Sequence, residues 1–290
     1  FTPTRTLPCS SAVHFWRSGR QPRQSSARCW TSAVRSAMGA KRVFFWRQPP
    51  ERRTMVTHLS LAKAASTRLN VLDTVEHRWS AEVLLRKRAV EPEAPGMFVS
   101  LTASGVAEEV FLVTLDAAEG GAFDAGDGEN ANNNDMMPQV RPSRSVLVLR
   151  AEKRTIQGST EVKEYFSRCK THSLAHRARV EGTQFFAGDF CVRVGKVENM
   201  QGSYAGTMVE VEYVPVSIPG GAGNVLDEYG KFVEQVFWDA ERENGNGGQK
   251  GALVAVPSDE ILKNFGLQDV AFGDAHEAVL YVACIMSMQS

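Results

Sequence analysis

The clearest fold signal lies in residues 179–213, which read RVEGTQFFAGDFCVRVGKVENMQGSYAGTMVEVEY. Apolar and polar residues alternate at positions 190–194 and again at 209–213, which is the period of a strand with one buried face. Residues 202–206 contain two glycines and can turn the chain between these runs. The sequence therefore predicts a neighbouring antiparallel pair of strands, with Glu210 and Glu212 on the solvated face of the second strand.

Further strands and helices flank this pair. Short apolar or alternating runs predict strands at residues 43–46, 79–85, 97–102, 110–115 and 145–150. Helical spacing of apolar residues predicts helices at 54–72, 161–170, 225–240 and 274–289. Many short antiparallel strands with several amphipathic helices indicate the α+β class.

The final helix suggests a contact with another protein, because its residues are apolar almost all round. Val279, Val282 and Met286 can face this chain's own sheet, so that Leu280 and Ile285 point elsewhere. A monomer rarely leaves such a surface open, and we expect a partner to cover Leu280 and Ile285. The alternative is that another helix of the same chain covers them.

Charge is unevenly distributed along the chain. The whole sequence has 33 basic and 33 acidic residues, but residues 1–50 hold nine basic and no acidic ones. Residues 51–290 are therefore acidic, which disfavours direct nucleic-acid binding because phosphate contacts need clustered Lys and Arg. No apolar run approaches the roughly 20 residues that a membrane-spanning helix needs. We expect neither nucleic acid nor a membrane as a partner.

The domain organisation follows from composition. Residues 1–37 form a basic leader rich in Arg and Ser, which is typical of a targeting segment. We favour upstream sequence instead, on the family resemblance given below, which begins at Met38. Residues 38–290 are predicted to form a single domain. Within it, residues 119–139 contain GGAFDAGDGENANNND, whose few apolar groups predict a disordered surface insertion.

Cysteine and histidine raise the question of a metal site. The five cysteines include no Cys-x-x-Cys, which indicates a reducing intracellular compartment rather than a disulfide framework. Cys169, His172 and His176 could share a helical face and bind zinc. The preferred interpretation is a helix C-terminus where the dipole favours histidine.

Two other patterns could carry chemistry. Paired carboxylates inside a β-tunnel can hold a divalent metal for phosphoryl transfer, so Glu210 and Glu212 keep a tunnel-type metal-dependent phosphohydrolase open as the alternative function. Residues 220–223, Gly-Gly-Ala-Gly, precede a helix as a phosphate-binding loop would, but no Gly-Lys-Ser/Thr follows. We expect no catalytic residue, no metal and no cofactor.

Residues 179–213 resemble subunit 20 of the Mediator complex. That family has the same order of features: a Glu-Gly-Thr or Arg-Gly-Thr start, an aromatic pair, an acidic-aromatic step, a strand ending Val-Gly, and a closing Val-Glu-Val-Glu-Tyr. Here these are Glu181-Gly182-Thr183, Phe185-Phe186, Asp189-Phe190, Val194-Gly195 and residues 209–213. Met38-Gly39, Trp79-Ser80 and Tyr281-Val282 fit the family at its start, second element and final helix.

The resemblance implies the architecture and the role. The fold would be a twisted antiparallel β-barrel of about eight strands with several packed helices, which removes open sheet edges. The chain would be a structural, non-enzymatic subunit of the Mediator head module in the nucleus, a coactivator of RNA polymerase II transcription acting through protein–protein contacts. Its implied partners are Mediator subunit 18, as a heterodimer, subunit 8 and other head-module subunits.

Overall fold

A computed structural model describes residues 38–48, 54–69, 71, 77–88, 109–119, 143–159, 161–168, 172–243 and 251–289. The basic leader, the predicted strand at 97–102 and residues 120–139 of the predicted insertion lie outside the described residues. None of the helices described is long and apolar enough to cross a membrane.

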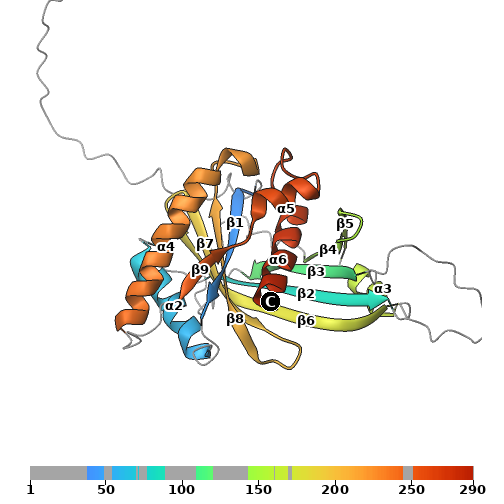
Figure 1. Cartoon of the computed structure of the whole chain (residues 1–290), viewed down its shortest axis with the longest axis horizontal. Coiled ribbons are helices and arrows are strands. Elements are labelled where there is room, and N and C mark those ends of the chain that lie inside the picture. Colours follow the sequence, from blue (N-terminus) through green and yellow to red (C-terminus); the bar gives the residue numbers. More distant parts are fainter. Residues whose placement is uncertain are drawn as a thin grey trace, which may run out of the picture. The chain divides into compact units, whose positions relative to one another are not determined.

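The centre of the fold is one antiparallel sheet of nine strands (Figure 1). The strands are β1 (Ala40–Arg47), β2 (His77–Arg88), β3 (Glu109–Glu119), β4 (Arg144–Leu149), β5 (Arg154–Gly158), β6 (His172–Ala187), β7 (Phe190–Glu198), β8 (Tyr204–Tyr213) and β9 (Ala252–Ala255). Their order is β5-β4-β3-β2-β6-β7-β8-β1-β9, so β5 and β9 are edges and the sheet stays open.

The predicted closed barrel of about eight strands is therefore wrong. The physical reason is the final helix, α6 (Asp274–Gln289), which contacts β1 and β8 at one end of the sheet and β3, β4 and β5 at the other. A helix with its side chains is about 10–12 Å wide, and the sheet curves around it instead of pairing its own edges.

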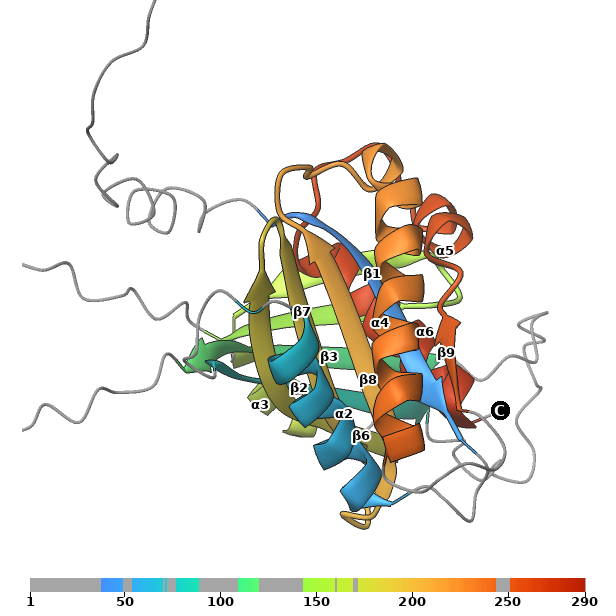
Figure 2. The ribbon, with the colours of Figure 1, turned by 90° about the vertical axis from the view of Figure 1, so that its left-hand side faces the viewer.

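Helices cover both faces of the curved sheet: the inner face, which is turned toward α6, and the outer face on the opposite side. On the outer face, α2 (Met55–Arg68) and α4 (Gly223–Glu243) share an apolar cluster with β1, β7 and β8, and Figure 2 shows both helices in front of these strands. On the inner face lie α6 and α5 (Ser258–Asn264). The short helix α3 (Glu161–Arg168) packs its Phe166 against Val110 and Leu112 of β3.

Most predicted elements are confirmed, and α6 has the predicted bounds. The alternation at 190–194 and 209–213 does form a neighbouring pair, in which Val192 lies opposite Val211 and Val194 opposite Val209. The sequence did not reveal β5, β9, α5 or the 16-residue strand β6. β6 lies in the middle of the sheet and pairs with both β2 and β7, so long-range pairing fixes it more than its own polar sequence does.

Candidate functional site

Six side chains from four distant elements meet on the inner face of the sheet. We call them the charge cluster: Lys41 of β1, Arg193 of β7, Glu210 and Glu212 of β8, and Glu277 and Tyr281 of α6. The strand register aligns them, because Lys41 lies opposite Glu212 and Arg193 opposite Glu210. Glu277 and Tyr281 are four residues apart and so share one helix face.

Lys41 is the centre of the charge cluster. Its Nζ lies 2.7 Å from Glu277 Oε2, 3.0 Å from Glu210 Oε1 and 3.6 Å from Glu212 Oε2. The ammonium group has three protons to donate, which matches its three carboxylate neighbours. Because the side chain is almost completely buried, these three carboxylates take the place of water around the charge.

Glu210 has no exposed surface, and both of its oxygens have donors within the chain. Oε1 accepts from Lys41 and from Nη1 of Arg193, and Oε2 accepts from the Tyr281 hydroxyl at 2.7 Å. The same hydroxyl also lies 3.0 Å from Glu277 Oε1, so the two carboxylates share its single proton. A buried carboxylate is stable only with such partners.

Glu212 ties the start of the described chain to the charge cluster. Its Oε1 accepts from the backbone N–H of Gly39 at 2.8 Å, and its Oε2 lies 3.5 Å from Nη2 of Arg193. Arg193 in turn donates from Nε to Gln184 at 2.6 Å. The charge cluster therefore joins β1, β6, β7, β8 and α6 through polar contacts.

The electrostatics keep both cations and Glu210 ionised. Burial favours the neutral form of each, but the neighbouring opposite charges outweigh it. Thus Arg193, Lys41 and the Tyr281 hydroxyl hold the pKa of Glu210 at about 2, and the carboxylates raise the pKa values of Lys41 and Arg193 above their usual range. Burial, Glu210 and Glu277 raise the pKa of Tyr281, so its phenol stays protonated and donates.

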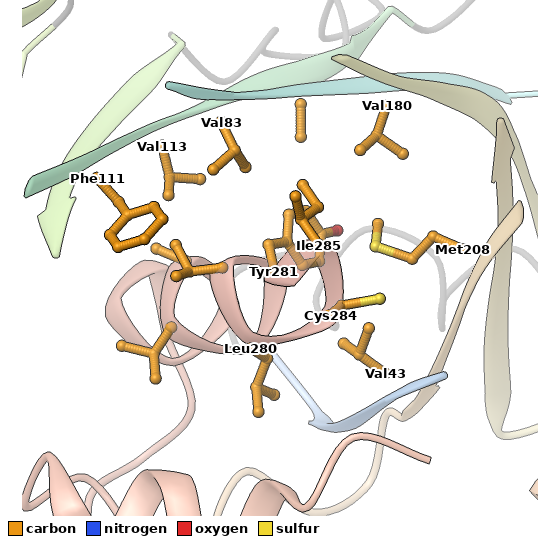
Figure 3. Packing of buried hydrophobic residues seen from close by; sticks show 14 of the residues in the cluster. Val43, Val83, Phe111, Val113, Val180, Met208, Leu280, Tyr281, Cys284 and Ile285 are labelled. Carbon is orange, nitrogen blue, oxygen red and sulfur yellow. The ribbon is translucent and has the colours of Figure 1, made fainter. Parts of the chain in front are cut away.

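The surroundings of the charge cluster are apolar. Figure 3 shows Tyr281, Cys284 and Ile285 of α6 surrounded by Val83, Val113, Val180, Met208 and Val43 of the sheet. The carboxylates that a divalent metal would need are bound by Lys41 and Arg193 instead. No group of three potential metal ligands occurs among the residues that the structure describes. The charge cluster can therefore hold α6 on the sheet, but it leaves no carboxylate free to bind a metal.

The predicted exposure of Glu210 and Glu212 is wrong. Glu210 is fully buried and Glu212 nearly so, because α6 covers the polar face of β8 while α4 covers its apolar face. Sequence reasoning also missed Lys41 and Glu277. A lysine at the start of the apolar run 40–46 and an acidic residue one helical turn before Tyr281 were the available signals.

The structure places Leu280 and Ile285 inside this chain's own core, with exposed fractions of 0% and 3%. They point to opposite sides of α6, and Ile285 faces the sheet beside Tyr281 (Figure 3). Leu280 shares an apolar cluster with Leu262 of α5, which packs on α6. The expectation that these side chains point away from the chain is wrong, because a second helix and the sheet cover both sides of α6. A partner contact at Leu280 and Ile285 stays a prediction.

Within the described residues, neither the predicted cysteine–histidine group nor the glycine run forms a site. Cys169 lies outside the described residues, and His172 and His176 lie on strand β6, so the shared helical face is wrong. Four residues along a strand span about 13 Å, too far for one ion. The glycine run belongs to a single turn of 3-10 helix, Pro219–Gly221, followed by α4.

Comparisons with known proteins give one family and several distant similarities. The family model for the "TATA-binding related factor (TRF) of subunit 20 of Mediator complex" matches residues 38–262. A curated relative, Mediator of RNA polymerase II transcription subunit 20b of Arabidopsis thaliana, is 26% identical over 89 residues, which are 30% of this chain and 41% of that relative. The chain thus spans about two fifths of the length of that relative.

Two solved structures are distantly similar to this chain. The PH1819 protein of Pyrococcus horikoshii OT3 has a TM-score of 0.34 at 9% identity, over 73% of this chain and 92% of that one. A chain of the Schizosaccharomyces pombe Mediator head module has a TM-score of 0.27 at 10% identity, over 59% of this chain and 81% of that one.

Proposed function

We propose an assembling, non-catalytic role for this chain, which belongs to the family of TATA-binding related factors that form subunit 20 of the Mediator complex. In this role it is a structural subunit of the Mediator head module in the nucleus. It supports RNA polymerase II transcription as a coactivator through protein–protein contacts. It carries out no reaction of its own.

One observation carries the non-catalytic part: the inner face of the sheet is filled. In a tunnel-type phosphohydrolase, carboxylates of the strands would line an open interior and bind a metal. Here α6 occupies the interior, and Lys41, Arg193 and Tyr281 engage both oxygens of Glu210. A substrate could reach Glu210 only by displacing a buried helix. Nothing favours the phosphohydrolase alternative.

The partners we propose are Mediator subunit 18, as a heterodimer, then subunit 8 and other head-module subunits. The outer helices offer a suitable contact surface, since α2 exposes 71% of Val56 and 57% of Leu59. On α4, Val225 and Phe232 are also exposed. Large apolar side chains left in solvent often mark a protein contact.

Co-purification tests the assembling role. The full chain and subunit 18 of the same organism are co-expressed, and their elution in one peak is expected. Replacing Val56 and Leu59 together by Ser should reduce the recovery of subunit 18, because it removes exposed apolar contacts without opening the core. Val270→Ser, at an exposed apolar position outside α2 and α4, is the matched control and should leave recovery unchanged.

Two results would contradict the proposal. Absence of subunit 18 and all other Mediator subunits from an affinity purification of the wild-type chain would refute the assembling role. A metal-dependent triphosphatase activity that Glu210→Gln abolishes in a still folded chain would refute the non-catalytic part.

We propose further that residues 1–37 are dispensable for these contacts, since the family match begins at residue 38. Residues 38–290 and the full chain should recover the same subunits and reach the nucleus equally. Import into an organelle that depends on residues 1–37 would contradict this.

A further inference from the structure

The two edges of the sheet differ in the contacts that their backbone groups make. At the β9 edge, side chains of α4 engage the backbone: Leu253 N–H donates to Glu234 Oε1 at 3.0 Å, and Trp238 Nε1–H donates to the carbonyl of Gly251 at 2.6 Å. At the other edge, β5 pairs with β4 on one side, and no strand of the described chain pairs with its other side. An open edge presents backbone donors and acceptors that another extended chain can pair with.

The surroundings of β5 combine apolar and basic side chains. Ile156 in the strand is 47% exposed. Two exposed basic residues, Arg150 and Lys153, lie in the turn that leads into β5, and the exposed Arg154 is the first residue of the strand. One acidic residue of this turn, Glu152, lies 3.8 Å from Arg154, and no ion pair of Arg150 or Lys153 occurs within the described part of the chain.

The backbone of Lys153 has a conformation that residues other than glycine rarely adopt. Its φ of 52° lies in the left-handed region, where glycine is the residue without a steric penalty. Lys153 is the one non-glycine residue in that region among those described. Turn geometry therefore does not account for a lysine here, whereas a function for its charge would.

We propose that β5 accepts an extended, acidic peptide segment of a partner protein, which adds to the sheet as a tenth strand. Backbone hydrogen bonds along β5 would supply affinity, Ile156 would contact an apolar side chain of the peptide, and Arg150 and Lys153 would contact its carboxylates.

Two other occupants fit this edge less well. Single-stranded nucleic acid would meet the positive charge, but it has no alternating amide N–H and C=O groups to pair with a strand. A second copy of this chain would pair through its own β5, whose residues RTIQG offer no carboxylate to Arg150 and Lys153. This inference does not rest on membership of the head module.

A peptide-binding assay tests the proposal. The probe is a fluorescein-labelled peptide of about eight residues with alternating valine and glutamate, titrated with the full chain at low ionic strength and followed by fluorescence anisotropy. Three competitors separate the contributions: the same peptide N-methylated at alternate residues, its lysine-for-glutamate counterpart, and single-stranded DNA. We expect the unlabelled acidic peptide to compete and these three to compete poorly.

Variants of the chain locate the site. Lys153→Gly should weaken peptide binding about two- to fivefold, as expected for loss of one exposed ion pair. The same change should leave the melting temperature unchanged or raise it, because glycine relieves the left-handed backbone. Ile156→Thr should also weaken binding. Lys231→Gln should not, because Lys231 is an exposed basic residue of α4, far from β5 in the sequence.

Four results would overturn the proposal. These are no binding of the acidic peptide, equal competition by the N-methylated peptide, equal competition by DNA, or a self-association of the chain that Lys153→Gly and Ile156→Thr abolish. Reduced peptide affinity in Lys153→Gly with an unchanged or higher melting temperature would support it, since a merely structural role predicts that both fall.

Discussion

Glu210→Gln should destabilise this chain strongly although it changes no side-chain volume. The folded chain holds the pKa of Glu210 at about 2, against an ordinary value of 4.5, through Arg193, Lys41 and Tyr281. A pKa difference of about 2.5, at 1.36 kcal/mol for each pH unit, corresponds to roughly 3 kcal/mol at neutral pH. Loss of one partner from a buried ion pair typically costs a similar amount, about 3–5 kcal/mol.

The pH dependence gives a second, independent signature. Because the pKa of Glu210 is lower in the folded chain than in the unfolded chain, its charge stabilises the fold at pH values above about 4.5. This stabilisation is lost as the pH falls toward about 2. Glutamine cannot ionise, so the difference in unfolding free energy between wild type and Glu210→Gln should be largest near pH 7 and shrink below about pH 4.5.

Urea unfolding followed by circular dichroism, repeated between neutral pH and about pH 3, measures this difference. Glu228→Gln is the matched control, since Glu228 is an exposed residue of α4, and it should stay within about 0.5 kcal/mol of wild type. A Glu210→Gln variant within about 1 kcal/mol of wild type at every pH would refute the reasoning, because it would mean that Glu210 is not buried among charges.

Three further changes test the packing on the two faces of the sheet. Tyr281→Phe removes a buried donor that two carboxylates share, and thermal unfolding should show a loss of about 1–3 kcal/mol. Gly230→Ala should lower the melting temperature, although alanine normally stabilises a helix by up to about 1 kcal/mol, since its Cβ would lie 2.7 Å from the ring of Phe44. Leu280→Ala should cost about 2–5 kcal/mol in urea unfolding, and Val270→Ala, at an exposed position, should stay within about 0.5 kcal/mol; equal effects would contradict the buried position of α6.

Part of the fold could be predicted from local patterns. The two-residue alternation in 190–194 and 209–213 identified β7 and β8, and the near-uniform apolar character of 274–289 predicted a helix buried on more than one side. These predictions held because each depends on residues that are neighbours within one element. The match to the subunit 20 family is likewise a property of the sequence.

The charge cluster and the open sheet belong to the tertiary structure alone. Alternation shows that Glu210 shares a strand face with Glu212, but it cannot show that α6 covers that face. Lys41 meets Glu277 across 236 residues of sequence, and β6 is a strand because β2 and β7 pair with it on both sides. The burial of a polar face depends on which distant element packs on it, and a charge can be buried there only where that packing also brings its opposite charges.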